Sequence, residues 1–276
     1  MKNKYFTLSN GVKIPAVGFG TWQIPNEDAS SSCLMALNAG YRHIDTALAY
    51  KNEAGVSDGI KKSGIARKDI FITTKLPASY KGYDECIKYF NESLNNLDTT
   101  YIDLYLIHAP WPWSNVGQDC TKENIETWKA MIDLYNMGKV RSIGVSNFHK
   151  KDIEALIEAT GFVPHVNQIR FFIGNTQNEI YDYCKEKNIL IEAYSPLATG
   201  SLLNDPVITK IAKKYNTTNA NICLSYCYLK GTLPLPKSTH NQRIIDNINF
   251  YIEIDEDDMK ELDLVHNKEL DRPLRS

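Results

Sequence analysis

Residues 70–108 read IFITTKLPASYKGYDECIKYFNESLNNLDTTYIDLYLIH and contain one repeating unit of the chain. The largely apolar segments 70–75 and 102–108 predict two strands, and residues 84–97 between them predict a helix. Parallel strands need a crossover connection of this kind, because the chain must return before the next strand can begin. The stretch therefore indicates an α/β fold with a parallel sheet.

The same unit recurs on both sides of this stretch. An Asn10-Gly11 turn predicts an N-terminal hairpin of residues 6–8 and 12–14. Further strands are predicted at residues 17–20, 41–45, 140–145, 165–169, 189–194 and 232–236. Further helices are predicted at residues 27–38, 53–62, 122–137, 150–159, 177–187, 206–215, 220–230, 242–247 and 256–265.

Eight strand–helix units in about 250 residues fit a (β/α)8 TIM barrel. We expect one domain spanning residues 1–276, with the N-terminal β-hairpin before the barrel and a C-terminal helix after it. A doubly wound open sheet is the alternative, and a G-x-G-x-x-G turn should then follow its first strand. Gly18 and Gly20 are followed by Gln23, so the third glycine is missing and the barrel is favoured.

The composition excludes several classes of protein. The chain has 276 residues with 31 Lys+Arg against 33 Asp+Glu, and 43% of its residues are hydrophobic. These values differ from those of disordered chains and of basic nucleic-acid binders. No stretch approaches the roughly 18–20 apolar residues that span a bilayer, and the first eight residues lack the apolar segment of a secretory signal. We therefore expect a cytoplasmic protein that binds neither nucleic acid nor membrane.

Six cysteines are spread along the chain, and none belongs to a C-x-x-C pair. Cys223 and Cys227 are four residues apart and share one face of a predicted helix, but no His pair lies nearby at zinc spacing. We interpret the cysteines as reduced core side chains and predict no metal site.

Three consecutive predicted strands end on an ionisable side chain, namely Asp45, Lys75 and His108. Tyr50 follows Asp45 by five residues, in the loop beyond the same strand. The C-terminal ends of barrel strands surround the active site, so the four side chains are expected to meet at one mouth. Each alone could be structural, for example as a helix cap or a core histidine. The run of three strands favours a catalytic site.

These four groups suit one kind of chemistry. A phenol ordinarily has a pKa of about 10, and a neighbouring cation such as Lys75 favours the phenolate and lowers that value. Asp45 can hold Lys75 in place, and His108 can donate a hydrogen bond to a substrate oxygen. A phenol and an imidazole donor suit a carbonyl that is becoming an alkoxide. The electrons must then come from a cofactor.

Several motifs occur in the order typical of one enzyme family. Residues 40–47 read GYRHIDTA and are followed by Tyr50 and Asn52-Glu53. The motifs LIH, GVSNF and LPKS follow at residues 106–108, 144–148 and 235–238. Together they resemble the aldo-keto reductases, in particular the microbial aldose, methylglyoxal and 2,5-diketo-gluconate reductase branch. That family folds as a (β/α)8 barrel, in agreement with the strand–helix pattern.

The resemblance implies a catalytic tetrad of Asp45, Tyr50, Lys75 and His108. In this family a hydride passes from the nicotinamide to an aldehyde or ketone carbon, and the tyrosine protonates the oxygen to give an alcohol. The implied function is an NADPH-dependent reductase, an oxidoreductase acting between carbonyl and alcohol. The alternative is an NADPH-binding, redox-sensing regulatory barrel subunit with little turnover.

The resemblance also implies where the cofactor binds. Residues in the first strand-to-helix loop and around the nicotinamide would be Gly20, Thr21, Ser146, Asn147, Gln168 and Tyr194. Residues at the pyrophosphate, 2′-phosphate and adenine would be Ser195, Leu197, Lys237, Ser238, Arg243, Asp246 and Asn247. A loop that opens a helix offers free backbone N–H groups to phosphate, and Lys237 and Arg243 add positive charge. This combination favours NADPH over NADH.

The substrate pocket is expected to contain Trp22, Trp111 and Trp113. Aromatic walls with few polar groups suit small aldehydes. The short tail at residues 272–276 resembles that of microbial family members. We expect a small-molecule carbonyl substrate, such as the α-oxoaldehyde methylglyoxal or a sugar-derived carbonyl, and a monomeric protein.

Overall fold

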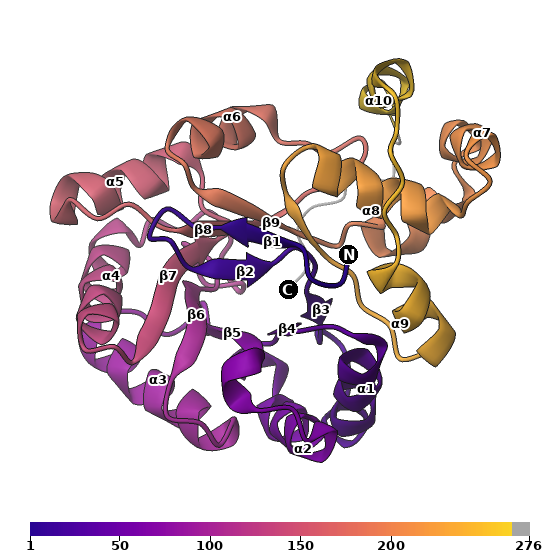
Figure 1. Cartoon of the computed structure of the whole chain (residues 1–276). Helices are drawn as coiled ribbons and strands as arrows, with labels where there is room; N and C mark the ends of the chain where they lie inside the picture. The colour runs from indigo at the N-terminus through magenta and orange to yellow at the C-terminus, as the bar shows by residue number, and fades with distance from the viewer. Residues whose placement is uncertain (267–276) are drawn as a thin grey trace.

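Eight parallel strands follow one another around a ring in the computed structural model, which describes residues 1–266 (Figure 1). Each strand is hydrogen-bonded to the next one in chain order. The strands are β3 (Phe19–Gly20), β4 (His43–Asp45), β5 (Phe71–Leu76), β6 (Ile102–Ile107), β7 (Val140–Ser146), β8 (Val166–Arg170), β9 (Leu190–Tyr194) and β10 (Leu233–Leu235). The predicted (β/α)8 barrel is confirmed.

The first and last strands meet through backbone hydrogen bonds. The Gly18 N–H donates to the Pro234 carbonyl at 3.1 Å, and the Gly20 N–H donates to the Pro236 carbonyl at 3.0 Å. A Cβ on Gly18 would lie 2.5 Å from Cδ2 of Leu235, so glycine is needed for this close approach. Gly18 and Gly20, which are not followed by the third glycine of a dinucleotide-binding turn, therefore help to close the barrel.

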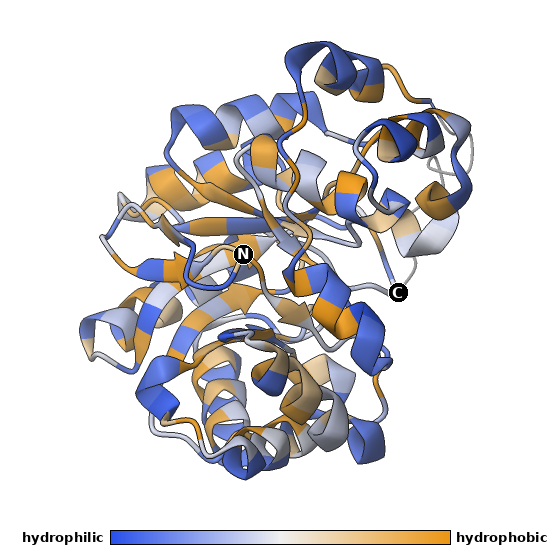
Figure 2. Ribbon diagram, turned by 45° about the vertical axis from the view of Figure 1, so that its right-hand side comes forward, coloured by the Kyte–Doolittle hydropathy of each residue, from blue (hydrophilic) through white to orange (hydrophobic). Residues whose placement is uncertain are grey.

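Helices surround the ring on its outside (Figure 1). The strands are mostly hydrophobic, whereas the helices carry both hydrophobic and hydrophilic residues (Figure 2), as expected when one helix face packs on the sheet. The helices are α1 (Asn26–Ala39), α2 (Glu53–Ser63), α3 (Tyr83–Asn96), α4 (Thr121–Asn136), α5 (Lys150–Thr160), α6 (Asn178–Glu186), α7 (Pro206–Lys214), α8 (Asn219–Leu229), α9 (Asn241–Ile248) and α10 (Glu256–Asp263).

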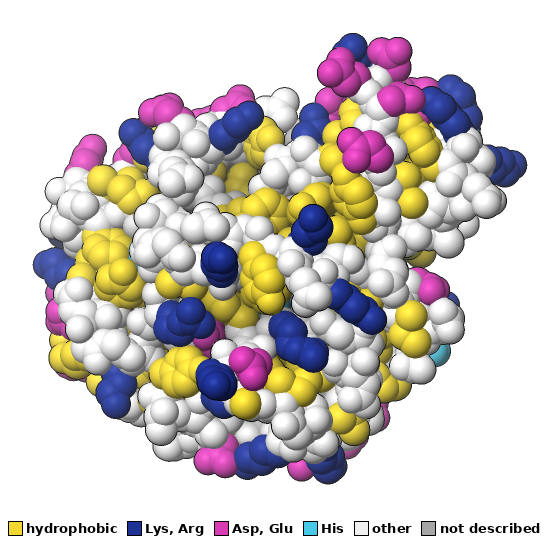
Figure 3. Space-filling view, in the orientation of Figure 1, with side chains coloured by type: hydrophobic (Ala, Val, Ile, Leu, Met, Phe, Trp, Pro, Cys, Tyr) yellow, Lys and Arg dark blue, Asp and Glu magenta, His cyan; other side chains and the backbone are white. Residues whose placement is uncertain are grey.

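A hairpin closes the N-terminal end of the barrel. Strands β1 (Tyr5–Thr7) and β2 (Lys13–Pro15) pair antiparallel and lie across the ring in Figure 1. Leu8 and Ile14 are buried in one cluster with barrel-strand residues such as Leu104. Lys and Arg side chains gather on this face (Figure 3). Because this end is covered, the C-terminal ends of the strands form the accessible mouth.

Three short 3-10 helices were not predicted from the sequence: η1 (Leu48–Tyr50), η2 (Arg67–Asp69) and η3 (Ala198–Asn204). All six cysteines are buried and free, as predicted. None of the helices in residues 1–266 combines the length and the apolar character needed to cross a bilayer. The tail that was compared with microbial relatives, residues 272–276, lies outside the described residues.

Candidate active site

Asp45, Tyr50 and Lys75 come together at the mouth of the barrel. Lys75 Nζ donates to Asp45 Oδ1 at 2.8 Å and to the Thr46 carbonyl at 2.8 Å, and it lies 3.4 Å from the Tyr50 hydroxyl. Asp45 and Lys75 end or nearly end the adjacent strands β4 and β5, so both side chains enter the same space. Lys75 is fully buried.

Tyr50 reaches this pair because η1 turns the chain back after β4. Asn52, directly beyond η1, is buried and ties the loop down through its side chain. Its Nδ2 donates to the Thr21 and Ile24 carbonyls at 2.9 Å each, and its Oδ1 accepts from Thr46 Oγ1 at 2.9 Å. The first two loops of the mouth are thus joined by one amide side chain.

His108 completes the group from the strand end of β6. Its ring packs edge-on against Tyr50 with the ring centroids 5.6 Å apart, and its backbone carbonyl accepts from Asn147 Nδ2 at 3.1 Å. Burial, together with Lys75 and Lys81, holds the pKa of His108 well below its ordinary value. The imidazole is therefore neutral and can donate one N–H. Within residues 1–266 its buried Nδ1 has no hydrogen-bond partner.

The acidity of Tyr50 differs from the expectation. Burial raises the pKa of Tyr50, and this outweighs the lowering caused by Lys75. Burial alone would lower the pKa of Lys75, but Asp45 and Tyr50 more than offset it, so that pKa is raised. The expected lowering of the Tyr50 pKa by its cation is wrong as a net effect. Tyr50 and Lys75 are therefore both protonated near neutral pH.

The residues expected around a nicotinamide carboxamide form a second connected group. Ser146 Oγ donates to the Gln168 carbonyl at 2.8 Å, and the Tyr194 hydroxyl donates to Asn147 Oδ1 at 2.8 Å. Asn147 has a φ of 60°, which is a left-handed conformation uncommon outside glycine. Strained positions of this kind often mark functional sites.

Gln168 also leads to a buried residue that the sequence interpretation missed. Its Nε2 donates to Asp45 Oδ2 at 2.8 Å and to Glu192 Oε2 at 2.7 Å. Glu192 is fully buried, and burial followed by the charge of Asp45 raises its pKa to about 8. A signal was present, since Glu192 interrupts the otherwise apolar stretch ILIEAY at residues 189–194.

The loop beyond β9 carries the expected pyrophosphate residues Ser195 and Leu197. Ser195 has a φ of 52°, and the following Ala198 and Thr199 have φ values of 47° and 57°. The Ala198 N–H donates to the Ser195 carbonyl at 2.8 Å, which closes a tight turn. Several consecutive left-handed positions in one loop at the mouth again indicate a functional conformation.

Gly20 and Thr21 lie beside the segment expected to bind the 2′-phosphate. Gly20 bonds to Pro236 as described above, and the Thr21 hydroxyl donates to the Asp45 carbonyl at 3.0 Å. The segment that follows Pro236 therefore begins next to β3 and the tetrad. This places the expected phosphate-binding loop at the mouth.

Two exposed cations occupy that loop and the helix after it. Lys237 and Arg243 are exposed, and neither forms an ion pair within the described part of the chain. Ser238 is buried and its Oγ accepts from the His240 N–H at 3.0 Å, just before α9 begins. Cations beside a helix N-terminus form a donor set that fits a phosphate.

The remaining adenine and substrate residues occupy different environments. Asp246 is exposed on α9 and accepts from Gln242, whereas Asn247 is buried. Trp113 lies against His108 with the ring centroids 6.1 Å apart, and Trp111 packs 5.1 Å from Trp113. Trp22 is 41% exposed. Trp113 thus lies nearest to the tetrad, and the other two indoles lie in covered and open positions, respectively.

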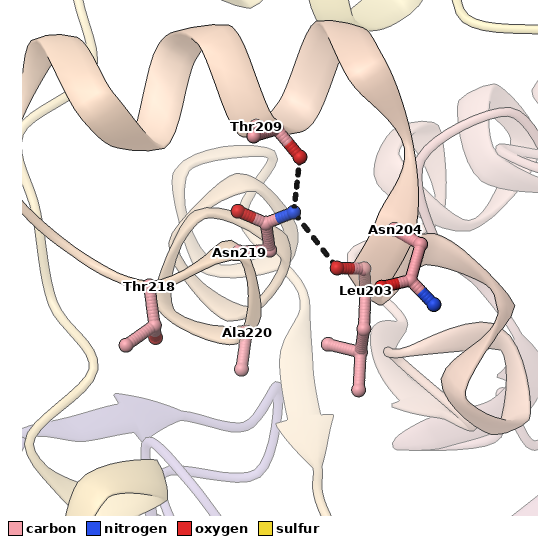
Figure 4. A pocket seen from close by; sticks show the side chains of 6 residues that line it. All are labelled: Leu203, Asn204, Thr209, Thr218, Asn219 and Ala220. Carbon is pink, nitrogen blue, oxygen red and sulfur yellow. Dashed lines mark hydrogen bonds between the residues drawn. The ribbon is translucent and has the colours of Figure 1, made fainter.

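Two surface pockets lie away from the tetrad. One of about 510 Å³ lies between η3, α7 and the start of α8, where Asn219 donates to the Leu203 carbonyl and to Thr209 (Figure 4). None of its lining residues is a predicted site residue. The other, of about 490 Å³, lies behind Trp111, between the β6–α4 loop and the start of α5. Neither pocket contains the tetrad.

Residues 16–267 match the sequence model of the aldo/keto reductase family. The chain belongs to this family. It is 42% identical over 264 residues to the glyoxal reductase of Bacillus subtilis, covering 95% of this chain and 92% of that protein. Its fold also matches solved structures of family members.

The structural relatives cover nearly the whole chain. An aldo/keto reductase from Brucella melitensis has a TM-score of 0.89 at 42% identity, covering 97% of this chain and 99% of that one. A Bombyx mori aldo-keto reductase, solved in complex with NADP, has a TM-score of 0.88 at 32% identity, covering 95% and 92%. The predicted family is therefore confirmed.

Proposed function

We propose that this chain reduces aldehydes or ketones to alcohols with NADPH, as a single-domain monomeric barrel. The observation that carries the proposal is the contact of the Tyr50 hydroxyl with the buried Lys75–Asp45 ion pair, with His108 alongside. Membership of the aldo/keto reductase family supports a carbonyl substrate. The NADP bound to the Bombyx mori relative supports the cofactor.

The proposed cofactor site extends from the tetrad to α9. Lys237 and Arg243 would bind the 2′-phosphate, with Ser238 beside it and Asp246 and Asn247 toward the adenine. Lys237 and Arg243 form no ion pair with any carboxylate among residues 1–266, so their positive charges are available to an anion. Ser195 and Leu197 would contact the pyrophosphate.

The nicotinamide end would lie against β7, β8 and β9. Ser146, Asn147 and Gln168 would hold the carboxamide, and Tyr194 would stack on the ring. The bound cofactor supplies a hydride to the carbonyl carbon. Gly20 and Thr21 would border the same space from β3.

Tyr50 would supply the proton. Because burial raises its pKa, the phenol holds its proton near neutral pH and gives it up only when negative charge develops on the substrate oxygen. The Lys75 ammonium, held by Asp45, stabilises the phenolate that remains. Neutral His108 would donate its N–H to the same oxygen and orient it.

The substrate would be a small carbonyl compound enclosed by Trp22, Trp111 and Trp113. The identity to the glyoxal reductase of Bacillus subtilis supports an α-oxoaldehyde such as methylglyoxal. The aromatic side chains themselves favour compact carbonyl compounds with apolar character.

The direct test is NADPH oxidation followed by absorbance, with glyoxal, methylglyoxal and a panel of simple aldehydes and ketones. We expect turnover that depends on both NADPH and the carbonyl compound. NADPH binding without turnover of any compound would overturn the proposal. A stable protein partner found together with negligible turnover would favour the regulatory barrel subunit instead.

A further inference from the structure

A row of buried polar side chains crosses the barrel interior from β9 to the tetrad. Glu192 accepts from Gln168 Nε2, and the same nitrogen donates to Asp45. Asp45 in turn accepts from Lys75, which lies beside the Tyr50 hydroxyl. Every link between Glu192 and Lys75 is between 2.7 and 2.8 Å. Glu192 is therefore connected to the proposed acid without touching it.

The hydrogen bonds of Gln168 fix which end of its amide is available. A primary amide has two N–H donors and one carbonyl acceptor. Both donors of Gln168 are engaged, one by Asp45 and one by Glu192. Only Oε1 remains for a bound molecule, so that molecule must present a donor. The NH₂ of a nicotinamide carboxamide is such a donor.

The two carboxylates of this row share one cation. Asp45 is paired with Lys75, whereas among residues 1–266 Glu192 has one potential ion-pair partner, His43, with 3.7 Å between Glu192 Oε1 and His43 Nε2. Burial and Lys75 lower the pKa of His43 to about 3, so its ring is neutral. On the neighbouring β10 strand, the residue in register with Glu192 is apolar Leu233.

Glu192 is consequently protonated near neutral pH. Burial and the charge of Asp45 raise its pKa to about 8, against the opposing effects of Gln168 and Lys75. A neutral carboxyl still accepts a hydrogen bond through Oε2, so it can anchor Gln168 without adding a second negative charge beside Asp45.

We propose that Glu192 is a positioning residue that shares the Gln168 amide nitrogen with Asp45 and so presents the Gln168 carbonyl oxygen to the nicotinamide carboxamide. This inference rests on the proposed function. Without Glu192, one N–H of Gln168 has no hydrogen-bond partner, and the side-chain amide can rotate so that its oxygen and nitrogen exchange places. The effect should fall on the nicotinamide half of the cofactor and leave the adenosine half unchanged.

The test compares two ligands by equilibrium titration with isothermal calorimetry at neutral pH. NADP⁺ contains both the nicotinamide half and the adenosine half of the cofactor, whereas adenosine 2′,5′-bisphosphate contains only the adenosine half with its 2′-phosphate. Glu192→Leu removes the acceptor at similar volume, and we expect it to weaken NADP⁺ by about tenfold, the equivalent of one hydrogen bond. Its affinity for the bisphosphate should stay within about twofold of wild type.

A matched variant separates the hydrogen bond from the charge. Glu192→Gln keeps an acceptor and cannot ionise, so it should bind NADP⁺ like wild type at neutral pH. In wild type, ionisation of Glu192 between about pH 7 and pH 9 favours the positively charged oxidised ring. The affinity for NADP⁺ relative to NADPH should therefore rise several-fold in wild type and stay flat in Glu192→Gln. Burial lowers the pKa of Lys81 to about 8, so Lys81 titrates in the same pH range. Because Lys81 is present in both wild type and Glu192→Gln, its effect cancels in the comparison.

The outcomes are distinguishable. Equal loss of both ligands in Glu192→Leu would overturn the positioning role, and the same pH dependence in wild type and Glu192→Gln would overturn the ionisation of Glu192 in this range. If Glu192→Leu does not fold, Glu192→Ala replaces it in the same two-ligand comparison. If wild type binds neither NADP⁺ nor the bisphosphate, the proposed function itself is wrong.

Discussion

The two ends of the barrel differ in how many cations accompany their buried carboxylates. At the closed end, Asp103 is fully buried and is paired with two cations, Arg67 at 2.8 Å and Arg141 at 2.7 Å. At the open end, Asp45 and Glu192 share the single cation Lys75. Removing one partner of a fully compensated buried carboxylate is costly to stability, whereas an undercompensated cluster is typical of a site built to bind or react.

The open end also contains buried groups without hydrogen-bond partners. Within residues 1–266, His108 Nδ1 and Glu192 Oε1 are buried without hydrogen-bond partners, and both belong to the open end. The left-handed residues Asn147 and Ser195 also lie there. The closed end instead covers its interior with the apolar Leu8 of the hairpin. Left-handed backbone and unpartnered buried groups therefore occur where we propose that the chemistry takes place, but they are not confined to it, since His43 Nδ1 and Tyr41 Oη are also buried without partners within residues 1–266.

The largest expected effect is on activity at the open end. Tyr50→Phe removes the proposed proton donor but keeps the ring, so kcat/KM for methylglyoxal should fall by about a thousandfold. The Kd of NADPH, measured by fluorescence titration, should hardly change. Tyr5→Phe, on the exposed hairpin, is the matched control and should behave like wild type. Near-normal turnover in Tyr50→Phe would show that this phenol is not the acid.

The second effect is on stability at the closed end. Asp103→Asn leaves two arginines without their carboxylate, and we expect the free energy of unfolding to fall by about 3 kcal/mol in urea denaturation. The activity of the folded fraction should be retained. Asp45→Asn should differ in losing activity as well, because the fully buried Lys75 beside Tyr50 loses its carboxylate. If both variants lose activity equally, the division between the two ends is wrong.

The third effect concerns the exposed cations of the open end. Arg243→Ala removes a planar fork that can grip a phosphate, so the Kd of NADPH should rise by about tenfold. NADH lacks the 2′-phosphate, and its Kd should stay nearly constant. Equal weakening of both nucleotides would mean that Arg243 does not contact that phosphate.

The fourth effect is a pH dependence of stability. The folded pKa of Glu192 is raised to about 8, above that of an unfolded chain, so the unfolded state binds fewer protons between about pH 5 and pH 8. The stability contributed by this site therefore falls as pH rises through that window. Glu192→Gln should gain stability relative to wild type by up to about 1.4 kcal/mol per pH unit. A constant difference across denaturation curves would contradict the raised pKa.

Much of the fold follows from local sequence patterns. The alternation of apolar segments and helices located all eight barrel strands, and polar residues at strand ends identified Asp45, Lys75 and His108. Barrel closure through Gly18 was not predicted, because the requirement for glycine arises only when the last strand approaches. The position of η1, which brings Tyr50 to Lys75, also depends on that tertiary arrangement.

The electrostatics of the site were less accessible to sequence reasoning. The predicted effect of Lys75 on Tyr50 was correct in direction, but burial is larger and reverses the net pKa shift. Glu192 was overlooked because a single acid in a strand does not show what it faces. Only the assembled barrel brings it to Gln168, which lies on a different strand.

The most direct test of the central claim is a crystal structure with NADP⁺ and a carbonyl-containing substrate analogue. The account predicts that the carbonyl oxygen lies within hydrogen-bond distance of both the Tyr50 hydroxyl and His108, with the carboxamide donating to Gln168 Oε1. A carbonyl oxygen bound away from Tyr50, or a nicotinamide outside the mouth of the barrel, would contradict it.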